Sequence, residues 1–387
     1  MIHIDPTLTP KNLEAAARRV FEASAPKIRA LQKRWKASHG TPVFTIAGKY
    51  TSRGWTEWTE GFVYGSAILQ YDATGDREML QIGREGTLRR MASHVTHVGV
   101  HDHGFNNIST YGNLRRLLLE KRLPANEWEA HFYDLAIKAS GAVQASRWTQ
   151  LTPELGYIRS FNGPHSLFSD TIRSLRALGL AHQLGQTLMG ENDHKISLLG
   201  RSTQHAETTA RYNVYYGKGR DAYDVPGRVV HESIFNVTDG AYRCPSTQQG
   251  YSAFTTWTRG HAWVLCGYPE QMEFLQTLPE ASFTEFGGKR KILNRFLQVA
   301  KVTADFYLRE TPTDGIPYWD TGAPGLVHLG DYRDRAADPF NYHEPVDSSA
   351  AAIAAQGLLR LGRYLQKHGN KEAGQTYFSA GLTVART

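Results

Sequence analysis

The stretch DSSAAAIAAQGLLRLGRYLQKHG, residues 347–369, decides the fold class. Its apolar residues recur at the spacing of one helix face. Asp347 or Ser348 can cap the start of this helix, and Gly369 can end it. Alanine fills much of the apolar face, so the helices around it must lie close. The stretch therefore indicates a core in which helices pack on helices.

The same pattern recurs along the chain. Residues 11–36 have the periodicity of an amphipathic helix. A polar or aromatic loop then opens into an apolar helix at 58–76, at 169–185 and at 257–268. The spacing between these segments is irregular, which excludes a short-period solenoid. We expect a series of helical hairpins, each with its polar loop at the start of one helix.

Strand signals are weak. Residues 227–244 can hold one short hairpin with Asp239 and Gly240 in its turn. The stretch 312–326 is short and rich in aromatic residues, which favours an ordered loop over a linker. We therefore expect one all-α domain over residues 1–387, with paired helices in a closed ring. The chain stops within an amphipathic stretch, so either the closing segment is short or a C-terminal piece is missing.

Composition excludes several protein classes. The chain has 387 residues, a net charge of +7 and a pI of about 9.2, and its basic residues form no block. Its two cysteines exclude a disulfide scaffold and a four-cysteine zinc site. We find no secretory pattern, no apolar run that could span a membrane and no nucleic-acid motif. These observations favour a cytoplasmic enzyme without a membrane or nucleic-acid partner.

The polar stretch HDHGFNN, residues 101–107, suggests chemistry. Its glycine and two amides favour a loop, with Gly104 allowing close approach of the backbone to a ligand. We expect no metal there, because the adjacent His101, Asp102 and His103 would diverge, and nothing specifies His205 or His231 as further ligands. A G-x-S-x-G elbow is absent.

A pair of carboxylates explains the polar residues better. Asp102 lies in the polar stretch, and Asp170 begins an apolar helix that Ser169 can cap in its place. Tryptophans and tyrosines that could stack on sugar rings lie at the same loop-to-helix junctions: Trp55, Trp58, Trp257, Trp263, Tyr318 and Trp319.

Ordered blocks give the chain a family resemblance. The blocks are WTEGF (58–62), YDATGD (71–76), HDHGF (101–105), DT (170–171), His205, DG (239–240), QGYS (249–252), WTRGHAW (257–263), DGIPYWD (314–320) and DSSAAAIAA (347–355). From about residue 15 onward the chain resembles glycoside hydrolase family 88, the unsaturated glucuronyl hydrolases. The resemblance implies an (α/α)6 barrel that removes a 4,5-unsaturated uronic acid from the non-reducing end of lyase-generated oligosaccharides.

The resemblance also implies roles for individual residues. Asp170 matches the catalytic acid and base, and Asp102 matches the second essential aspartate. The matched substrate-binding residues are Trp58, His101, His205, Gln249, Trp257, Arg259 and Trp263. Among these, Gln249 would orient the acid and Arg259 would bind the substrate carboxylate. The chemistry requires no metal or cofactor, and the protein is expected to be a monomer or a homodimer.

Some positions depart from the family pattern. The family usually has an aliphatic residue at His103, which here either points outward or contacts the second sugar. It usually has glutamine at His261 and a segment rich in methionine and asparagine after Asp170, where this chain reads TIRSLRAL. The same reaction on an unsaturated galacturonyl-rhamnose substrate, a histidine-based sugar epimerase, and a binding protein without catalysis remain as alternatives.

Overall fold

The computed structural model describes residues 1–52 and 57–387, so Trp55 lies outside the described residues. Contacts divide the chain into two compact units. The first unit comprises Met1–Glu14, Trp148–Arg173 and Thr203–Thr387, and the second comprises Ala15–Arg147 and Ser174–Ser202. The single domain expected over residues 1–387 stays a prediction.

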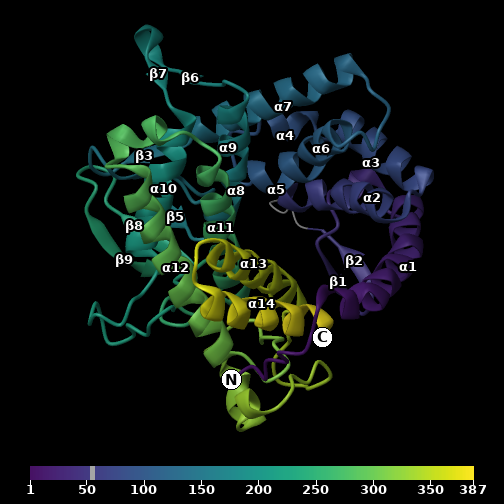
Figure 1. Cartoon of the computed structure of the whole chain (residues 1–387), viewed down its shortest axis with the longest axis vertical. Helices are drawn as coiled ribbons and strands as arrows, with labels where there is room; N and C mark the ends of the chain where they lie inside the picture. Colours follow the sequence, from purple (N-terminus) through teal and green to yellow (C-terminus); the bar gives the residue numbers. More distant parts are fainter. Residues whose placement is uncertain (53–56) are drawn as a thin grey trace. The chain divides into compact units, whose positions relative to one another are not determined.

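The second unit is built mainly from helices that follow one another in the chain (Figure 1). They are α1 (Pro10–Arg34), α2 (Glu60–Thr74), α3 (Arg77–Arg90), α4 (Ala92–Val95), α5 (His103–Asn107), η3 (Ile108–Gly112), α6 (Asn113–Leu119), α7 (Glu127–Ser146) and α9 (Arg176–Gln183). Two small antiparallel pairs accompany them: β1 (Phe44–Ile46) with β2 (Lys49–Thr51), and β6 (Leu188–Met189) with β7 (Lys195–Ile196).

Helices α2 and α3 form a hairpin, and two residues of its turn, Gly75 and Asp76, explain why the first helix ends and the second begins. Gly75 has a φ of 74°, a left-handed conformation that ends α2 at low cost. The Asp76 carboxylate then accepts hydrogen bonds from the N–H groups of Glu78 and Met79 and caps α3. The block YDATGD is therefore a helix stop followed by a helix start.

The first unit contains the longer helices of the second half of the chain. They are α8 (Thr171–Ser174), α10 (Leu198–Tyr212), α11 (Thr258–Gln276), α12 (Lys289–Glu310), α13 (Ser348–Lys367) and α14 (Lys371–Arg386); α8 and α10 each cross a unit boundary. Its strands are β3 (Trp148–Gln150), β4 (Gly156–Ile158), β5 (Ser166–Phe168), β8 (Glu232–Phe235) and β9 (Tyr242–Ser246).

Helix α13 confirms the interpretation of residues 347–369. The Asp347 carboxylate accepts the N–H of Ala350, and Gly369 takes a φ of 89° just beyond the helix. A Cβ on Gly357 would lie 2.7 Å from the Leu265 carbonyl oxygen of α11, and one on Gly362 would lie 2.7 Å from the Phe378 nitrogen of α14. Small residues thus let α13 lie backbone-to-backbone against both neighbouring helices.

A three-stranded antiparallel sheet in the order β5-β8-β9 brings distant segments together. Strand β5 pairs with β8 in the register Phe168↔Glu232, and the Ser169 N–H donates to the His231 carbonyl at 2.8 Å. The β8–β9 hairpin confirms the one expected within 227–244, and Gly240 has the φ of 72° that its turn needs. The sheet therefore brings His231, which pairs with Ser169, next to Asp170, the residue after Ser169.

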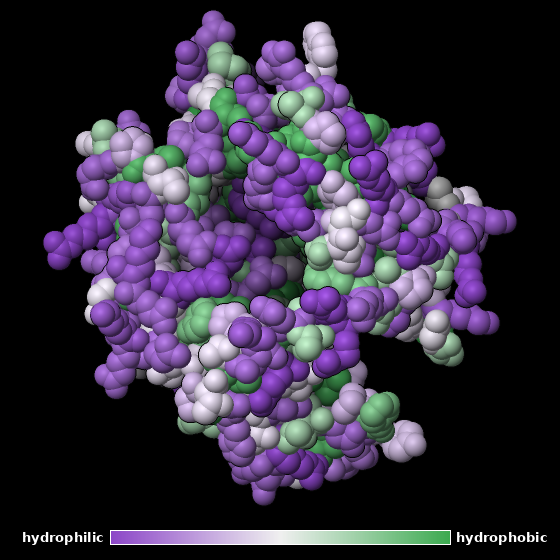
Figure 2. Space-filling view, turned by 45° about the vertical axis from the view of Figure 1, so that its right-hand side comes forward, coloured by the Kyte–Doolittle hydropathy of each residue, from purple (hydrophilic) through white to green (hydrophobic). Residues whose placement is uncertain are grey.

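Hydrophilic side chains cover most of the visible face in Figure 2, in agreement with a mean hydropathy of −0.45. Among the helices of residues 1–52 and 57–387, none has the length and apolar character needed to cross a membrane.

Candidate active site

Asp170 follows strand β5 and immediately precedes α8, and only 5% of its surface is exposed. His231 is one of its partners, and His231 Nε2 lies 3.4 Å from Asp170 Oδ1. Both residues belong to the first unit. The distance is longer than a normal hydrogen bond, as is common for catalytic contacts before substrate binds.

The surroundings of His231 determine which ring nitrogen carries its proton. Nδ1 accepts the backbone N–H of Gln248 at 3.0 Å and that of Gln249 at 3.3 Å. A nitrogen that accepts cannot also hold a proton, so the neutral ring carries its N–H at Nε2, which faces Asp170. Ring contacts with Phe168 at 4.3 Å and Trp257 at 4.8 Å hold the imidazole in this orientation.

The stretch HDHGFNN lies in the second unit, and the loop expected there is wrong. Residues His103–Asn107 form helix α5, and all of them are buried. This polar helix can be buried because its side chains find hydrogen-bond partners. The Asn106 side chain, for example, accepts the Gly61 N–H at 2.8 Å and donates to His94 Nδ1 at 3.0 Å. A polar sequence therefore became a buried helix through its hydrogen bonds.

Gly104 is required for close approach to protein backbone. A Cβ at this position would lie 2.2 Å from the Ser174 carbonyl oxygen. The Ser174 hydroxyl accepts the Gly104 N–H at 2.8 Å and donates to the His101 carbonyl at 2.6 Å. Ser174 and the side chain of Gln144, which also donates to His101 O, therefore fix the backbone on either side of Asp102.

His103 neither points outward nor is available to a second sugar. It is 1% exposed; its Nδ1 accepts from the Ser140 hydroxyl at 2.9 Å and its Nε2 donates to the His97 carbonyl at 3.0 Å. Burial lowers the pKa of His103 to about 4, so the ring is neutral. His261 on α11 is a second buried histidine; burial lowers its pKa to about 4, and it packs against Phe306 and Tyr307.

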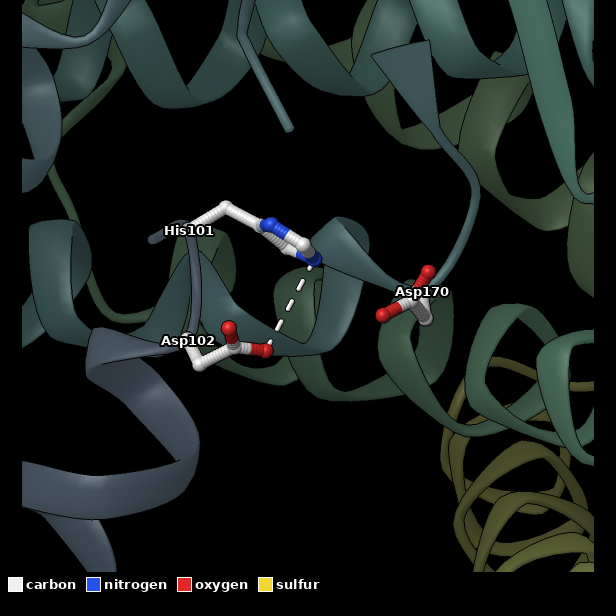
Figure 3. A group of neighbouring side chains, drawn as sticks. All are labelled: His101, Asp102 and Asp170. Carbon is white, nitrogen blue, oxygen red and sulfur yellow. Dashed lines mark ion pairs between the residues drawn. The ribbon is translucent and has the colours of Figure 1, made fainter. Parts of the chain in front are cut away.

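His101 and Asp102 form a close pair, drawn with a dashed line in Figure 3. His101 Nε2 lies 3.6 Å from Asp102 Oδ1, and the two residues are 2% and 5% exposed. Figure 3 also shows Asp170 at the start of its helix. Buried carboxyl groups of this kind bind a ligand hydroxyl or exchange a proton more readily than exposed ones.

The junction before α11 holds two of the predicted substrate-binding residues. Trp257 is 4% exposed and forms a β-bridge with Asp320. The Arg259 guanidinium lies 5.0 Å from the Trp257 ring centroid, and its Nη1 is 2.6 Å from Asp347 Oδ2. Because about a third of Arg259 is exposed, it can bind an anion while it keeps this ion pair.

The other predicted substrate-binding residues are distributed over both units. His205 on α10 is fully buried, and its Nδ1 accepts the Ile158 N–H at 3.0 Å. Gln249 contacts His231 through its backbone, and Trp263 on α11 lies 5.8 Å from the Arg173 guanidinium. Trp58, in the second unit, has edge contacts with Phe62 and Phe105.

His231 is the functional residue that sequence reasoning missed. It had been considered only as a distant metal ligand, because it stands alone in VVHES without a motif around it. The predicted hairpin gave one indication of its role, because a histidine at the start of a strand can face the segment that pairs with that strand. The pairing partner, however, is not visible in the sequence.

Comparisons with known proteins agree with these motifs. No protein-family model matches the chain. The chain is 26% identical over 313 residues to an unsaturated glucuronyl hydrolase of Formosa agariphila, which covers 80% of this chain and 64% of that protein. It is 26% identical over 330 residues to an unsaturated glucuronyl hydrolase of Bacillus sp. (strain GL1), covering 83% and 71% of the two chains. The chain thus spans about two thirds of the length of these relatives.

Solved structures give the same result for the fold. The crystal structure of the unsaturated glucuronyl hydrolase from Bacillus sp. GL1 matches with a TM-score of 0.65 at 22% identity, over 92% of this chain and 80% of that one. An unsaturated glucuronyl hydrolase specific for heparin matches with a TM-score of 0.67 at 21% identity, over 95% and 83%. The predicted all-α fold, an (α/α)6 barrel, is confirmed. These relatives and solved structures agree with the resemblance of the chain to the unsaturated glucuronyl hydrolases, glycoside hydrolase family 88.

Proposed function

We propose that this protein hydrolyses oligosaccharides capped by a 4,5-unsaturated glucuronic acid, converts that cap to a keto sugar and releases the rest of the oligosaccharide. The observation that carries the proposal is the buried pair of Asp170 and His231, in which the imidazole Nε2 lies 3.4 Å from one carboxyl oxygen. Family relatives named for this activity support the substrate class.

The reaction is the hydration of a vinyl ether. A proton passes from the Asp170 carboxyl to C4 of the substrate, and positive charge develops at C5, where the ring oxygen stabilises it. Water adds to C5 while the Asp170 carboxylate accepts a proton from it, so the acid is regenerated. The hemiketal at C5 then opens to a keto sugar and releases the remaining oligosaccharide as an alcohol.

His231 specifies which oxygen of Asp170 delivers the proton. Because Nε2–H faces Oδ1, that oxygen acts as an acceptor and the transferable proton is placed on Oδ2. A cationic imidazole would favour the carboxylate and so oppose the first step. The two backbone N–H groups donate to Nδ1, so the nitrogen on the Asp170 side is Nε2.

The remaining residues bind the sugar. Asp102, paired with His101, would accept hydrogen bonds from the C2 and C3 hydroxyls and support the positive charge at C5. Arg259 would bind the substrate carboxylate, since a guanidinium matches it in a planar fork. Trp58, Trp257 and Trp263 would stack on sugar faces, while His205 and Gln249 would support this site through the backbone groups they contact.

The test is an ultraviolet assay on unsaturated disaccharides made by lyases from chondroitin, hyaluronan, heparin, gellan-type and rhamnogalacturonan polymers. Hydration destroys the conjugated alkene-carboxylate, so absorbance falls. We expect loss with at least one glucuronyl substrate and none with Asp170→Asn. Loss only with the rhamnogalacturonan product would assign the galacturonyl substrate instead. Absorbance that stays constant on the whole panel would contradict the proposal.

Heavy water distinguishes this reaction from epimerisation. The proposed step adds one solvent proton at C4, so a reaction in deuterium oxide should place one deuterium there. A histidine-based epimerase would leave the alkene intact, exchange a proton at a stereocentre and tolerate Asp170→Asn.

A further inference from the structure

Asp170 immediately precedes helix α8, which is too short to keep its conformation without contacts to the rest of the protein. Helix α8 spans only Thr171–Ser174, and the Arg173 N–H donates to the Asp170 carbonyl at 3.0 Å. One turn of helix is not stable alone, so tertiary contacts must hold it. Ile172, fully buried, supplies one, because a Cβ on Gly267 of α11 would lie only 2.9 Å from its Cγ2.

Arg173 supplies the polar contacts that anchor α8. The residue is 6% exposed, and its Nε lies 2.6 Å from Glu270 Oε2. Its Nη1 lies 2.7 Å from Cys266 Sγ, and its Nη2 lies 3.3 Å from Gln356 Oε1. Arg173 therefore ties the turn that follows Asp170 to α11 and α13 at once, in the segment TIRSLRAL that departs from the family pattern.

A buried cation at this place affects a neighbouring acid. Arg173 is in backbone contact with Asp170, and a positive charge buried near a carboxyl favours the ionised form of that carboxyl. Glu270 opposes that effect, because it places a negative charge in direct contact with Arg173. The charged or titratable groups around this set include His231 at Asp170, Cys266 and Glu273, which act on Arg173, and Arg360, 3.8 Å from Glu270.

We propose that Arg173 and Glu270 are positioning residues that act as one neutral pair. Arg173 fixes the turn that carries Asp170, and Glu270 cancels the charge that the anchor would otherwise impose on that carboxyl. This inference rests on the proposed function only for the role of Asp170; the effect on its proton affinity does not depend on the substrate.

The test measures the pKa of Asp170 directly. Carbon-13 aspartate labelling, with Asp170→Asn to assign the carboxyl signal, gives its titration in the full-length protein without substrate. We expect Glu270→Gln to lower this pKa by about one unit and Arg173→Met to raise it by about one unit. The double variant removes both charges and should return the value to that of the parent protein.

Glu372→Gln is the control for the charge change. Glu372 is an exposed residue in the first turn of a different helix, α14, so its loss of charge should leave the pKa of Asp170 unchanged. If Arg173→Met fails to fold, Glu270→Gln and the double variant still give the comparison. Equal pKa values in Glu270→Gln, the double variant and the parent protein would overturn the proposal.

Activity gives a second and independent readout. An acid loses activity as the pH rises through its pKa, so the alkaline limb of kcat should move down by about one pH unit in Glu270→Gln and return in the double variant. If the parent protein were inactive on every disaccharide, the proposed function would be contradicted. The titration of Asp170 would still test whether Arg173 and Glu270 act as a neutral pair.

Discussion

The Nε2–H of His231 faces Oδ1 of Asp170 at 3.4 Å, because two backbone N–H groups occupy the other nitrogen of the imidazole. The 3.4 Å distance places the two side chains next to each other, and the two N–H groups at Nδ1 leave Nε2 as the ring nitrogen that carries the proton. Neither residue is near the other in sequence. Strand pairing between β5 and β8 creates the contact.

Asp170→Asn should abolish hydration while the protein stays folded. Asparagine preserves the shape of the side chain but cannot deliver a proton to C4. General acid–base catalysis contributes about 10²–10⁴-fold, so kcat should fall at least about a hundredfold. Steady-state kinetics by ultraviolet absorbance, with circular dichroism as the folding control, measures this. Residual activity above a tenth of the parent value would exclude Asp170 as the acid.

His231→Phe separates packing from proton placement. Phenylalanine keeps the contacts with Phe168 and Trp257 but removes the N–H that faces Asp170. We expect kcat to fall about tenfold to a hundredfold with little change in KM, which corresponds to the loss of one hydrogen bond to a charged group. His261→Phe, at a buried histidine that packs against Phe306 and Tyr307, is the comparison, and an equal loss of kcat there would argue for a general effect of burial.

Arg259→Met should raise KM about tenfold or more, because charge-assisted hydrogen bonds to the substrate carboxylate would be lost. The change also leaves the buried Asp347 without its partner. Arg259→Met combined with Asp347→Asn is therefore the better test, since asparagine still caps α13 and carries no charge. An unchanged KM in both variants would remove Arg259 from the binding site.

His103 makes stability depend on pH. Its pKa is about 4 in the folded protein and 6.5 in the unfolded chain, so the unfolded chain binds the extra proton between these values. The stability is fully present above pH 6.5 and is lost as the pH falls toward 4, by about 3 kcal/mol in total. His103→Leu should reduce the slope of the unfolding free energy by about 1.4 kcal/mol per pH unit in this window, as urea titrations would show. A slope equal to that of the parent protein would mean that His103 is protonated in the fold.

Gly104→Ala should destabilise the protein by about 2–4 kcal/mol, because the new methyl group would overlap the Ser174 backbone. Gly112→Ala is its control. That glycine is also helical, and its Cβ would meet only the Ile108 side chain, at 3.0 Å, which can move. Thermal unfolding of both variants checks the difference. Equal melting temperatures would show that the Ser174 backbone can move away from the new methyl group at little cost in free energy.

Helices and their ends were predictable from the sequence because their signals are local. Asp347 caps α13, Gly369 follows its end and alanines mark its contact face, and all three features lie within 23 residues (347–369). The turn at Gly240 and the amphipathic helix of residues 11–36 were found for the same reason. The identity of Asp170 and Asp102 as candidates came from motif order.

Tertiary structure alone decided how those candidates are supported. HDHGFNN is polar in sequence, yet the segment is buried in the structure. Hydrogen bonds with Ser140, Ser174 and Gln144 satisfy its polar groups there. His231, Arg173 and Glu270 become relevant to Asp170 only through strand pairing and helix packing. A sequence shows which side chains can donate, accept or carry charge, but the partner of each one is set by contacts between distant segments. For this protein, the sequence by itself determined the helices and nominated the two aspartates through a family resemblance, whereas the contacts of His231 and the charges around Asp170 depend on packing between distant segments.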